Sequence, residues 1–219
     1  MKTIIYFTYN MVYICWIKLC MNQQLPIHQV ADIFSGYTFR TLPPENNAGH
    51  IIIAQPRDID QRTLQLLTEN ALRADEFSGG AKFMIRSGDI LIGSKGKTTP
   101  IILIGEIVDK IVASSTFIVV RAFSNMISPD YLAWYLQLPV VQSFLNSSKS
   151  GSTVLNLPIK AVQDCSVDLP SLPTQRAIGK LYASLLQKNK KQLELMEKYT
   201  LLINSGLYEQ IRQKSKEGG

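Results

Sequence analysis

The sequence predicts an α+β fold: a mixed, largely antiparallel sheet in a globular domain, followed by one long C-terminal helix of the coiled-coil type. Short apolar runs bounded by glycine or proline, such as 51–55 and 116–121, are typical of strands. Prolines at positions 170 and 173 open a helical pattern that continues through Leu202, and Pro173 is expected to be its first residue. We therefore expect an apolar N-terminal extension over 1–20, the globular domain over 21–170, and the helix with its tail over 171–219.

The N-terminal extension is mostly apolar but matches a membrane-spanning helix poorly. The stretch 4–19 is interrupted by Asn10 and Lys18, and it is shorter than the roughly twenty residues that a spanning helix needs. Lys2 precedes it, as in a signal peptide, but no small-residue cleavage site follows. Two interpretations stay open: a loosely attached peptide or an extension before a translation start at Met21, and a membrane or export signal.

Turns and strands alternate through the globular domain. After a lead-in at 25–34 comes a turn at 35–40, whose backbone N–H groups can hold a phosphate while Arg40 reaches a base or a second phosphate. Tyr37 and Thr38 are candidates for base-edge or sugar contacts. An ordinary surface turn has the same composition. The further expected segments are a strand at 51–55, mixed helix and loop at 57–73, strand, turn and strand over 82–92, a loop at 93–100, and strands within 101–107 and 116–121.

The loop at 93–100 copies part of a nucleotide-binding motif. Gly96-Lys97-Thr98 matches the end of a P-loop, but position 91 is leucine where the motif requires glycine. Pro100 and a strand follow where the motif requires a helix, so we do not expect ATP binding. Lys95 and Lys97 are better suited to DNA phosphates, with a plain hairpin turn as the alternative.

A helix is expected at 127–137, where Ser128 caps it and Pro129 begins it. Its core-facing stripe indicates that its aromatic residues pack inside the domain more often than they stack on bases. The stripe consists of Leu132, Tyr135 and Leu136.

A hydroxyl-rich loop is expected at 147–153. Its side chains Lys149, Ser152 and Thr153 can donate hydrogen bonds to phosphates or base edges. A solvated linker would look the same.

The C-terminal helix presents an apolar seam along its length. Seam residues recur at alternating steps of three and four, interrupted by Lys188 and Gln192, and they are Ile178, Leu181, Leu185, Leu195, Tyr199 and Leu202. Such a helix needs a partner, and Gly206 is expected to end it. A helix that lies on its own domain is the alternative.

Charge and cysteine content limit the kinds of binding site that the chain can contain. The net charge of +6 is concentrated in the helix: residues 21–140 hold ten Lys or Arg against eleven Asp or Glu, whereas 173–219 hold nine against four. A DNA surface in the domain must therefore come from local clusters. The three cysteines and two histidines give neither a disulfide framework nor a zinc spacing, and Cys165 is expected to be a buried, inert thiol.

No set of catalytic residues is recognisable in the sequence. It lacks the paired carboxylates with a lysine of a nuclease, the glycine-rich cofactor loop of a methyltransferase, and a histidine placed to activate a nucleophile. We expect a binding protein, without a cofactor, a metal or a small-molecule substrate of its own.

Five segments, in this order and spacing, carry a family resemblance. They are Val30-Ala31-Asp32-Ile33 with Ser35-Gly36-Tyr37-Thr38; Ser87-Gly88-Asp89-Ile90-Leu91-Ile92 with Lys95-Gly96; Ile127 to Leu136; Ser150-Gly151-Ser152-Thr153 with Leu157; and Leu169-Pro170 through Gln175-Arg176-Ala177-Ile178. With these segments, nearly the whole chain after Met21 resembles the specificity (S) subunit of type I restriction-modification systems.

The resemblance implies a target-recognition domain over 21–170 that reads half of a bipartite double-stranded DNA sequence, followed by a spacer and docking helix. In that family a separate adenine methyltransferase (M) subunit and a separate restriction (R) subunit supply the chemistry, and the expected location is cytoplasmic. Members usually carry two such domains and two helices, so one of each implies a half-size S subunit that forms a homodimer through the seam. An inactive S fragment and a membrane-anchored or exported protein are the alternatives.

Overall fold

The computed structural model describes residues 23–39 and 49–217, with side chains as far as residue 208. The expected N-terminal extension over 1–20 lies outside the described residues. The chain divides into two compact units, Met1–Lys180 and Leu181–Gly219, and the boundary lies within helix α5 (Leu172–Glu217). None of the helices in the described part of the chain is long and apolar enough to cross a membrane.

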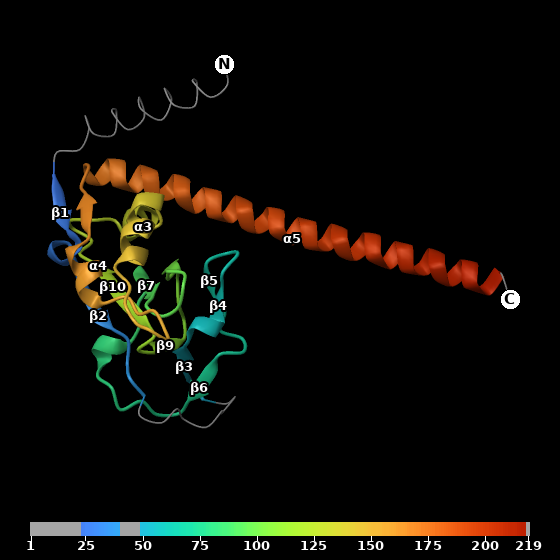
Figure 1. Ribbon diagram of the computed structural model, residues 1–219, viewed down its shortest axis with the longest axis horizontal. Helices are drawn as coiled ribbons and strands as arrows, with labels where there is room; N and C mark the ends of the chain where they lie inside the picture. The colour runs from blue at the N-terminus through green and yellow to red at the C-terminus, as the bar shows by residue number, and fades with distance from the viewer. Residues whose placement is uncertain (1–22, 40–48, 218–219) are drawn as a thin grey trace, which may run out of the picture. The chain divides into compact units, whose positions relative to one another are not determined.

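Short strands and helices alternate in the first unit (Figure 1). The strands are β1 (Gln24–Pro26), β2 (Ala31–Ser35), β3 (Ile51–Ala54), β4 (Ile59–Asp60), β5 (Gln65–Leu66), β6 (Leu72–Ala74), β7 (Asp89–Gly93), β8 (Ile101–Leu103), β9 (Lys110–Ala113), β10 (Phe117–Ala122) and β11 (Ser166–Asp168). The helices that precede α5 are α2 (Pro129–Leu136), α3 (Pro139–Ser147) and α4 (Ile159–Asp164). Turns of 3-10 helix lie at Ile27–Gln29, Pro56–Asp58 and Ala81–Phe83.

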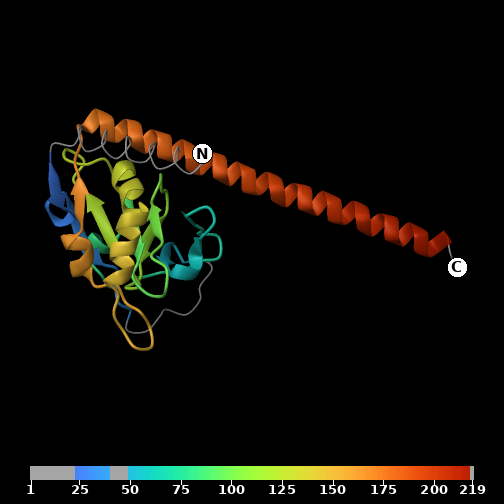
Figure 2. The ribbon, with the colours of Figure 1, turned by 45° about the horizontal axis from the view of Figure 1, so that its top comes forward.

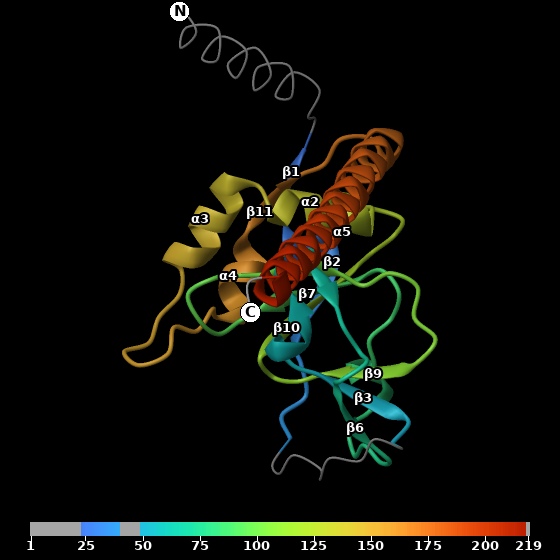
Figure 3. The ribbon, with the colours of Figure 1, turned by 90° about the vertical axis from the view of Figure 1, so that its right-hand side faces the viewer.

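Two sheets form the centre of the first unit (Figure 3). The larger has the order β2-β10-β7-β8, and its neighbouring strands are all antiparallel. The smaller has the order β6-β3-β9, in which β3 and β9 run parallel. The expected α+β class, with a mixed, largely antiparallel sheet domain and a long C-terminal helix, is confirmed.

The larger sheet is covered on both faces. Ile90 and Ile92 of β7 pack in one apolar cluster with α2 and α4, and Figure 2 shows helices lying across this face of the strands. Leu91, between them, packs in a second cluster with Ile52 and Ala113 of the smaller sheet. Because both faces are buried, these strands are apolar at nearly every position instead of alternating with polar residues. The stripe expected on α2, Leu132, Tyr135 and Leu136, is also buried.

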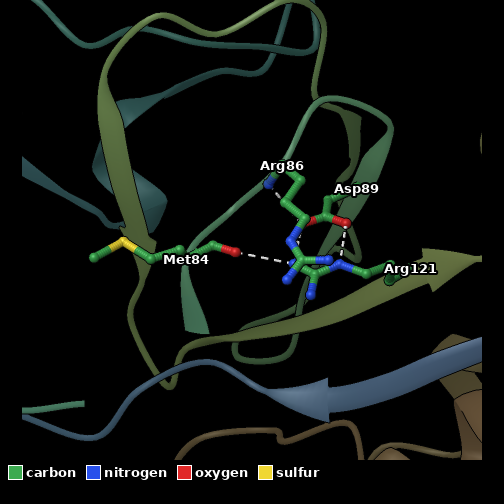
Figure 4. A network of polar contacts seen from close by, with 4 residues as sticks. All are labelled: Met84, Arg86, Asp89 and Arg121. Carbon is green, nitrogen blue, oxygen red and sulfur yellow. Dashed lines mark hydrogen bonds and ion pairs between the residues drawn. The ribbon is translucent and has the colours of Figure 1, made fainter. Parts of the chain in front are cut away.

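A buried ion pair joins the two central strands (Figure 4). Asp89 and Arg121 lie opposite each other in the β7–β10 register. The guanidinium donates from Nε and Nη2 to the two carboxylate oxygens over 2.8 and 2.7 Å, and Nη2 also donates to the Met84 carbonyl over 2.9 Å. The Arg86 N–H donates to the same carboxylate over 2.8 Å. These hydrogen bonds account for the Ser-Gly-Asp turn, since one carboxylate both closes the turn and neutralises Arg121.

The first turns of α5 are tied to α2 by Gln175. Its side chain is almost fully buried, and its Oε1 accepts a hydrogen bond from the Ser128 N–H over 2.8 Å. Its Nε2 donates to the carbonyls of Met126 and Pro170 over 3.2 and 2.9 Å. Ser128 precedes α2 as expected, but its hydroxyl makes no capping bond, so the expected side-chain cap is wrong. The contact made at this position is that of the Ser128 N–H with Gln175.

Several sequence expectations for the first unit are corrected. Residues 82–86 are not a strand: Ala81–Phe83 forms a 3-10 turn and Met84 makes an isolated bridge. The expected helical character within 57–73 is replaced by β4, β5 and most of β6. Strand β9 and helices α3 and α4 lie in segments for which no such element was predicted. All of these elements are short, so packing on their neighbours decides their structure more than local propensity does.

Helix α5 starts earlier and ends later than expected. Its first residue is Leu172 rather than Pro173, and the Ser171 hydroxyl accepts a bond from the Thr174 N–H over 3.4 Å. The helix passes through Gly206 and runs to Glu217, so the expected end at Gly206 is wrong. A helical glycine costs about 1 kcal/mol relative to alanine. Good helix formers such as Leu, Glu, Gln, Arg and Lys are frequent in the segment that follows it, and they offset that cost.

Cys165 is buried at the end of α4, as expected. Burial raises the pKa of its thiol to about 11. The reactive thiolate is therefore scarce at neutral pH, in keeping with an inert packing residue.

We predict that Asp89→Ala lowers the free energy of unfolding by about 3 kcal/mol, the lower end of the range for a buried pair, because Arg121 is partly exposed but loses its carboxylate partner. The matched control is Asp164→Ala, which breaks an exposed i,i+4 pair with Lys160 and costs about 0.5 kcal/mol or less. Urea denaturation of the two variants measures the difference. Equal losses would show that the buried pair contributes no more than a surface pair.

Candidate nucleic-acid interface

Two loops that are distant in sequence lie side by side at one end of the larger sheet. We call them the paired loops: 94–100, between β7 and β8, and 149–157, between α3 and α4. The Gly96 N–H donates to the Leu155 carbonyl over 2.9 Å, and the Leu157 N–H donates to the Ser94 carbonyl over 2.7 Å. Lys95 also bridges to Asn156. The paired loops therefore form one surface rather than two independent turns.

Lys149 fastens the paired loops together. Its Nζ donates to the carbonyls of Gly96 and Thr98 over 2.9 and 2.8 Å, and burial lowers its pKa. The two glycines of the paired loops have left-handed backbones, with φ of 96° at Gly96 and 131° at Gly151. A Cβ at Gly151 would lie 2.2 Å from the Val154 carbonyl oxygen, so no other residue fits this turn.

The paired loops bring together five of the predicted DNA-binding residues. Lys95, Lys97, Ser152 and Thr153 have exposed side chains, whereas Lys149 is half-buried against loop carbonyls. Neither loop contains Asp or Glu. The result is a local positive cluster in a domain whose overall charge is nearly balanced, which is the arrangement that phosphate binding requires.

The turn with Tyr37 and Thr38 lies at the same end of the larger sheet. There β2 and β7 end and β10 begins, because Ser35 and Gly93 pair with the first residues of β10. Thr38 is exposed. Arg40, the third residue predicted in this turn, lies outside the described residues.

The Tyr37 ring belongs to a half-buried aromatic cluster. Its centroid lies 4.7 Å from Phe39, 4.7 Å from Phe77 and 5.3 Å from Phe83, in edge-to-face geometry. Its hydroxyl is 2.8 Å from the Ser78 hydroxyl. Packing therefore uses most of this ring, and only part of its surface is left for a ligand.

A hollow of about 340 Å³ borders the loop 94–100, and sequence reasoning did not find it. Its polar walls are carboxamides from three separate segments, Gln61, Gln137, Gln142 and Asn146, together with Lys97, Thr98 and Thr99. Scattered glutamines and asparagines give no motif, and two of these four lie on α3, a helix that was not predicted. Only the folded chain gathers them.

The described residues include no group of three or more His, Cys, Asp or Glu side chains able to hold a metal ion. A second hollow, of about 460 Å³, lies along 103–109. Its charged lining residues are the acidic Glu106 and Asp109, so it is electrostatically unsuited to nucleic acid.

The predicted seam residues of α5 differ in their surroundings. Ile178, in the first unit, packs on the cluster that contains Ile90 and Ile92. The other five, in the second unit, are between 51% and 74% exposed: Leu181, Leu185, Leu195, Tyr199 and Leu202. An exposed apolar stripe of this length on a helix is unusual and is typical of an interaction surface.

The comparison with protein-family models identifies one family. Residues 22–211 match the family model described as "Type I restriction modification DNA specificity domain". No curated protein matches the chain.

Three solved structures illustrate the shared fold. The HsdS subunit from Thermoanaerobacter tengcongensis is 20% identical, with a TM-score of 0.56 over 77% of this chain and 43% of its own. The type I restriction-modification S subunit from M. genitalium is 12% identical, with a TM-score of 0.53 over 75% of this chain and 39% of its own. A chain from a type I R-M system, solved to explain complex assembly and conformational transition, is 19% identical, with a TM-score of 0.58 over 78% and 43%.

At these identities the solved structures show the fold alone, and the chain spans less than half the length of each. The family model is the stronger finding, since it covers most of the sequence and both units. The chain therefore belongs to the family of type I restriction-modification DNA specificity domains.

Proposed function

We propose that the chain is the DNA-recognition subunit of a type I restriction-modification system and reads one half of a bipartite target. The observation that carries the proposal is the family match over 22–211. The paired loops support it, because they offer a lysine cluster without carboxylates on a rigid sheet scaffold.

In this proposal the paired loops hold the DNA backbone. Lys95 and Lys97 contact phosphates, and the hydroxyls of Ser152 and Thr153 donate to phosphate or sugar oxygens. Lys149 acts mainly on the loops, since two of its three ammonium N–H donors bond to loop carbonyls. The neighbouring turn adds contacts through Thr38, Arg40 and the part of the Tyr37 ring that is not packed against other aromatic rings.

The proposed subunit recognises DNA without catalysing a reaction. An adenine methyltransferase subunit and a restriction subunit bind it and supply the chemistry, in the cytoplasm, and the chain requires no cofactor of its own. The family supports these roles.

We further propose that the exposed seam of the second unit pairs with a second copy of this chain. Heptad spacing favours an antiparallel pair centred near residue 190, in which Leu185 lies against Leu195 of the second copy and Lys188 against Gln192. A parallel pair in register would instead set Lys188 against itself, and like charges repel. A two-fold pair carries two recognition domains and therefore reads a split inverted repeat.

The function as a whole is tested by mapping methylated adenines in cells with and without this gene. We expect one bipartite, inverted-repeat motif to lose methylation when the gene is deleted and to regain it on complementation. An unchanged methylation map in cells that contain the methyltransferase subunit would contradict the proposal.

Salt dependence tests the phosphate contacts. We predict that Lys95→Ala and Lys97→Ala each weaken binding to all duplexes and reduce the slope of log affinity against log salt by about 0.9, the value for one lost phosphate contact. Lys149→Met weakens binding through the loop but leaves the slope unchanged.

The control for these slopes is Lys110→Ala, since Lys110 is exposed at the far end of β9 from the paired loops. Fluorescence anisotropy at several salt concentrations measures all four variants. Slopes that stay at the wild-type value in Lys95→Ala and Lys97→Ala would remove these residues from the interface.

The homodimer is tested with lysines placed in the seam. We predict that the double variant Leu195→Lys, Leu202→Lys sediments as a monomer, because charges in an apolar seam oppose association. Asn204→Lys places the same side chain on the outer face of the helix and leaves the dimer intact. Analytical ultracentrifugation distinguishes the two, and a wild-type chain that is monomeric at micromolar concentration contradicts the proposal.

A further inference from the structure

The hollow beside the loop 94–100 differs chemically from the paired loops. Its lining is rich in carboxamides, and Lys97 is its one charged residue among those that the structure describes. The other sizeable hollow of the first unit is lined by two carboxylates and no lysine or arginine. Of these two hollows, only the one beside the paired loops has a charge that suits DNA.

Three of the four carboxamides are each held in place by an internal hydrogen bond of their own. Gln137 Nε2 donates to the Ile101 carbonyl over 3.3 Å, and Gln142 Nε2 donates to the Leu136 carbonyl over 2.9 Å. Asn146 Oδ1 accepts a bond from the Thr99 hydroxyl over 2.8 Å. These bonds leave the opposite atom of each group for a ligand: acceptor oxygens on Gln137 and Gln142, and donor hydrogens on Asn146.

A mixture of donors and acceptors favours base edges over phosphate. Phosphate oxygens only accept hydrogen bonds, so a glutamine oxygen gains nothing by facing them. In the major groove, base edges present amino donors on adenine and cytosine beside acceptors on every base pair. A carboxamide offers both partners at once, and asparagine and glutamine are the usual readers of adenine.

We infer that the exposed carboxamides of this hollow, Asn146 and Gln61, read base edges in the major groove while the adjacent paired loops hold the backbone, and that both are specificity-determining residues. The inference rests on the proposed DNA-recognition function and adds the surface that discriminates sequence. Lys97 links the two surfaces, because it belongs to the loop and also lines the hollow. Gln61 lines the hollow from the turn between β4 and β5.

The test separates base preference from general affinity. Full-length wild type, Asn146→Ala and Gln61→Ala, each with the methyltransferase subunit, select duplexes from a randomised library that is then sequenced. We expect each variant to lose preference at one or two positions by roughly 10-fold or more, as for the loss of a base contact. Affinity for a non-target duplex and the salt slope stay within twofold of wild type.

Thr99→Val is the matched control for Asn146→Ala. It removes the same internal hydrogen bond but keeps the Asn146 carboxamide, so it retains the wild-type preference. Circular dichroism and urea midpoints show whether each variant is folded. Gln61 is an exposed turn residue, so Gln61→Ala is the variant whose substitution disturbs the fold least.

The outcomes are distinguishable. A wild-type complex that selects no sequence overturns the proposed function and this inference with it. Selection by wild type that Asn146→Ala and Gln61→Ala leave unchanged overturns the inference alone. The inference would also be overturned if the two variants bound the methyltransferase subunit less tightly but kept their base preference. The hollow would then be a protein-docking surface.

Discussion

The buried pair of Asp89 and Arg121 fixes the register on which the rest of the first unit depends. Strands β7 and β10 are apolar on both faces, so hydrophobic alternation alone specifies their register weakly. A slip of one residue would still bury isoleucine and valine, but it would separate the two charges inside the protein. Unpaired buried charges cost several kcal/mol, on the order of 3–5. The charge pair thus selects one register among several that apolar packing would accept.

That register determines where the loops at the opposite end of the sheet lie. Once Gly93 pairs with Phe117, the loop 94–100 leaves the sheet beside the start of β10, where its backbone bonds to 149–157. The hydrogen-bonded ladder thus supports the paired loops of the candidate interface, a common division between scaffold and binding site. The turn after β2 lies at the same end of the sheet, because Ser35 at the end of β2 pairs with Ile118 near the start of β10.

Sequence reasoning succeeded where local signals are strong. Pro129 marks α2, the lysine-glycine loop marks 94–100, and the proline pair marks the start of α5 within one residue. It failed where structure depends on distant partners: β9 gains its hydrogen bonds from β3, and Gln175 acts through α2. The union of the two loops and the carboxamide hollow likewise arises only from tertiary contacts, which leave no periodic pattern in the sequence.

Lys149 illustrates why a predicted binding residue can act without touching its ligand. Its ammonium points at two carbonyls that belong to the loop bearing Lys95 and Lys97. Without that ammonium, the partial negative charges of the Gly96 and Thr98 oxygens would be left unneutralised in the surface that we propose for phosphate binding. A leucine would fill the space but could not satisfy those oxygens. The lysine therefore contributes by neutralising the carbonyl oxygens of the loop that it holds, without a phosphate contact of its own.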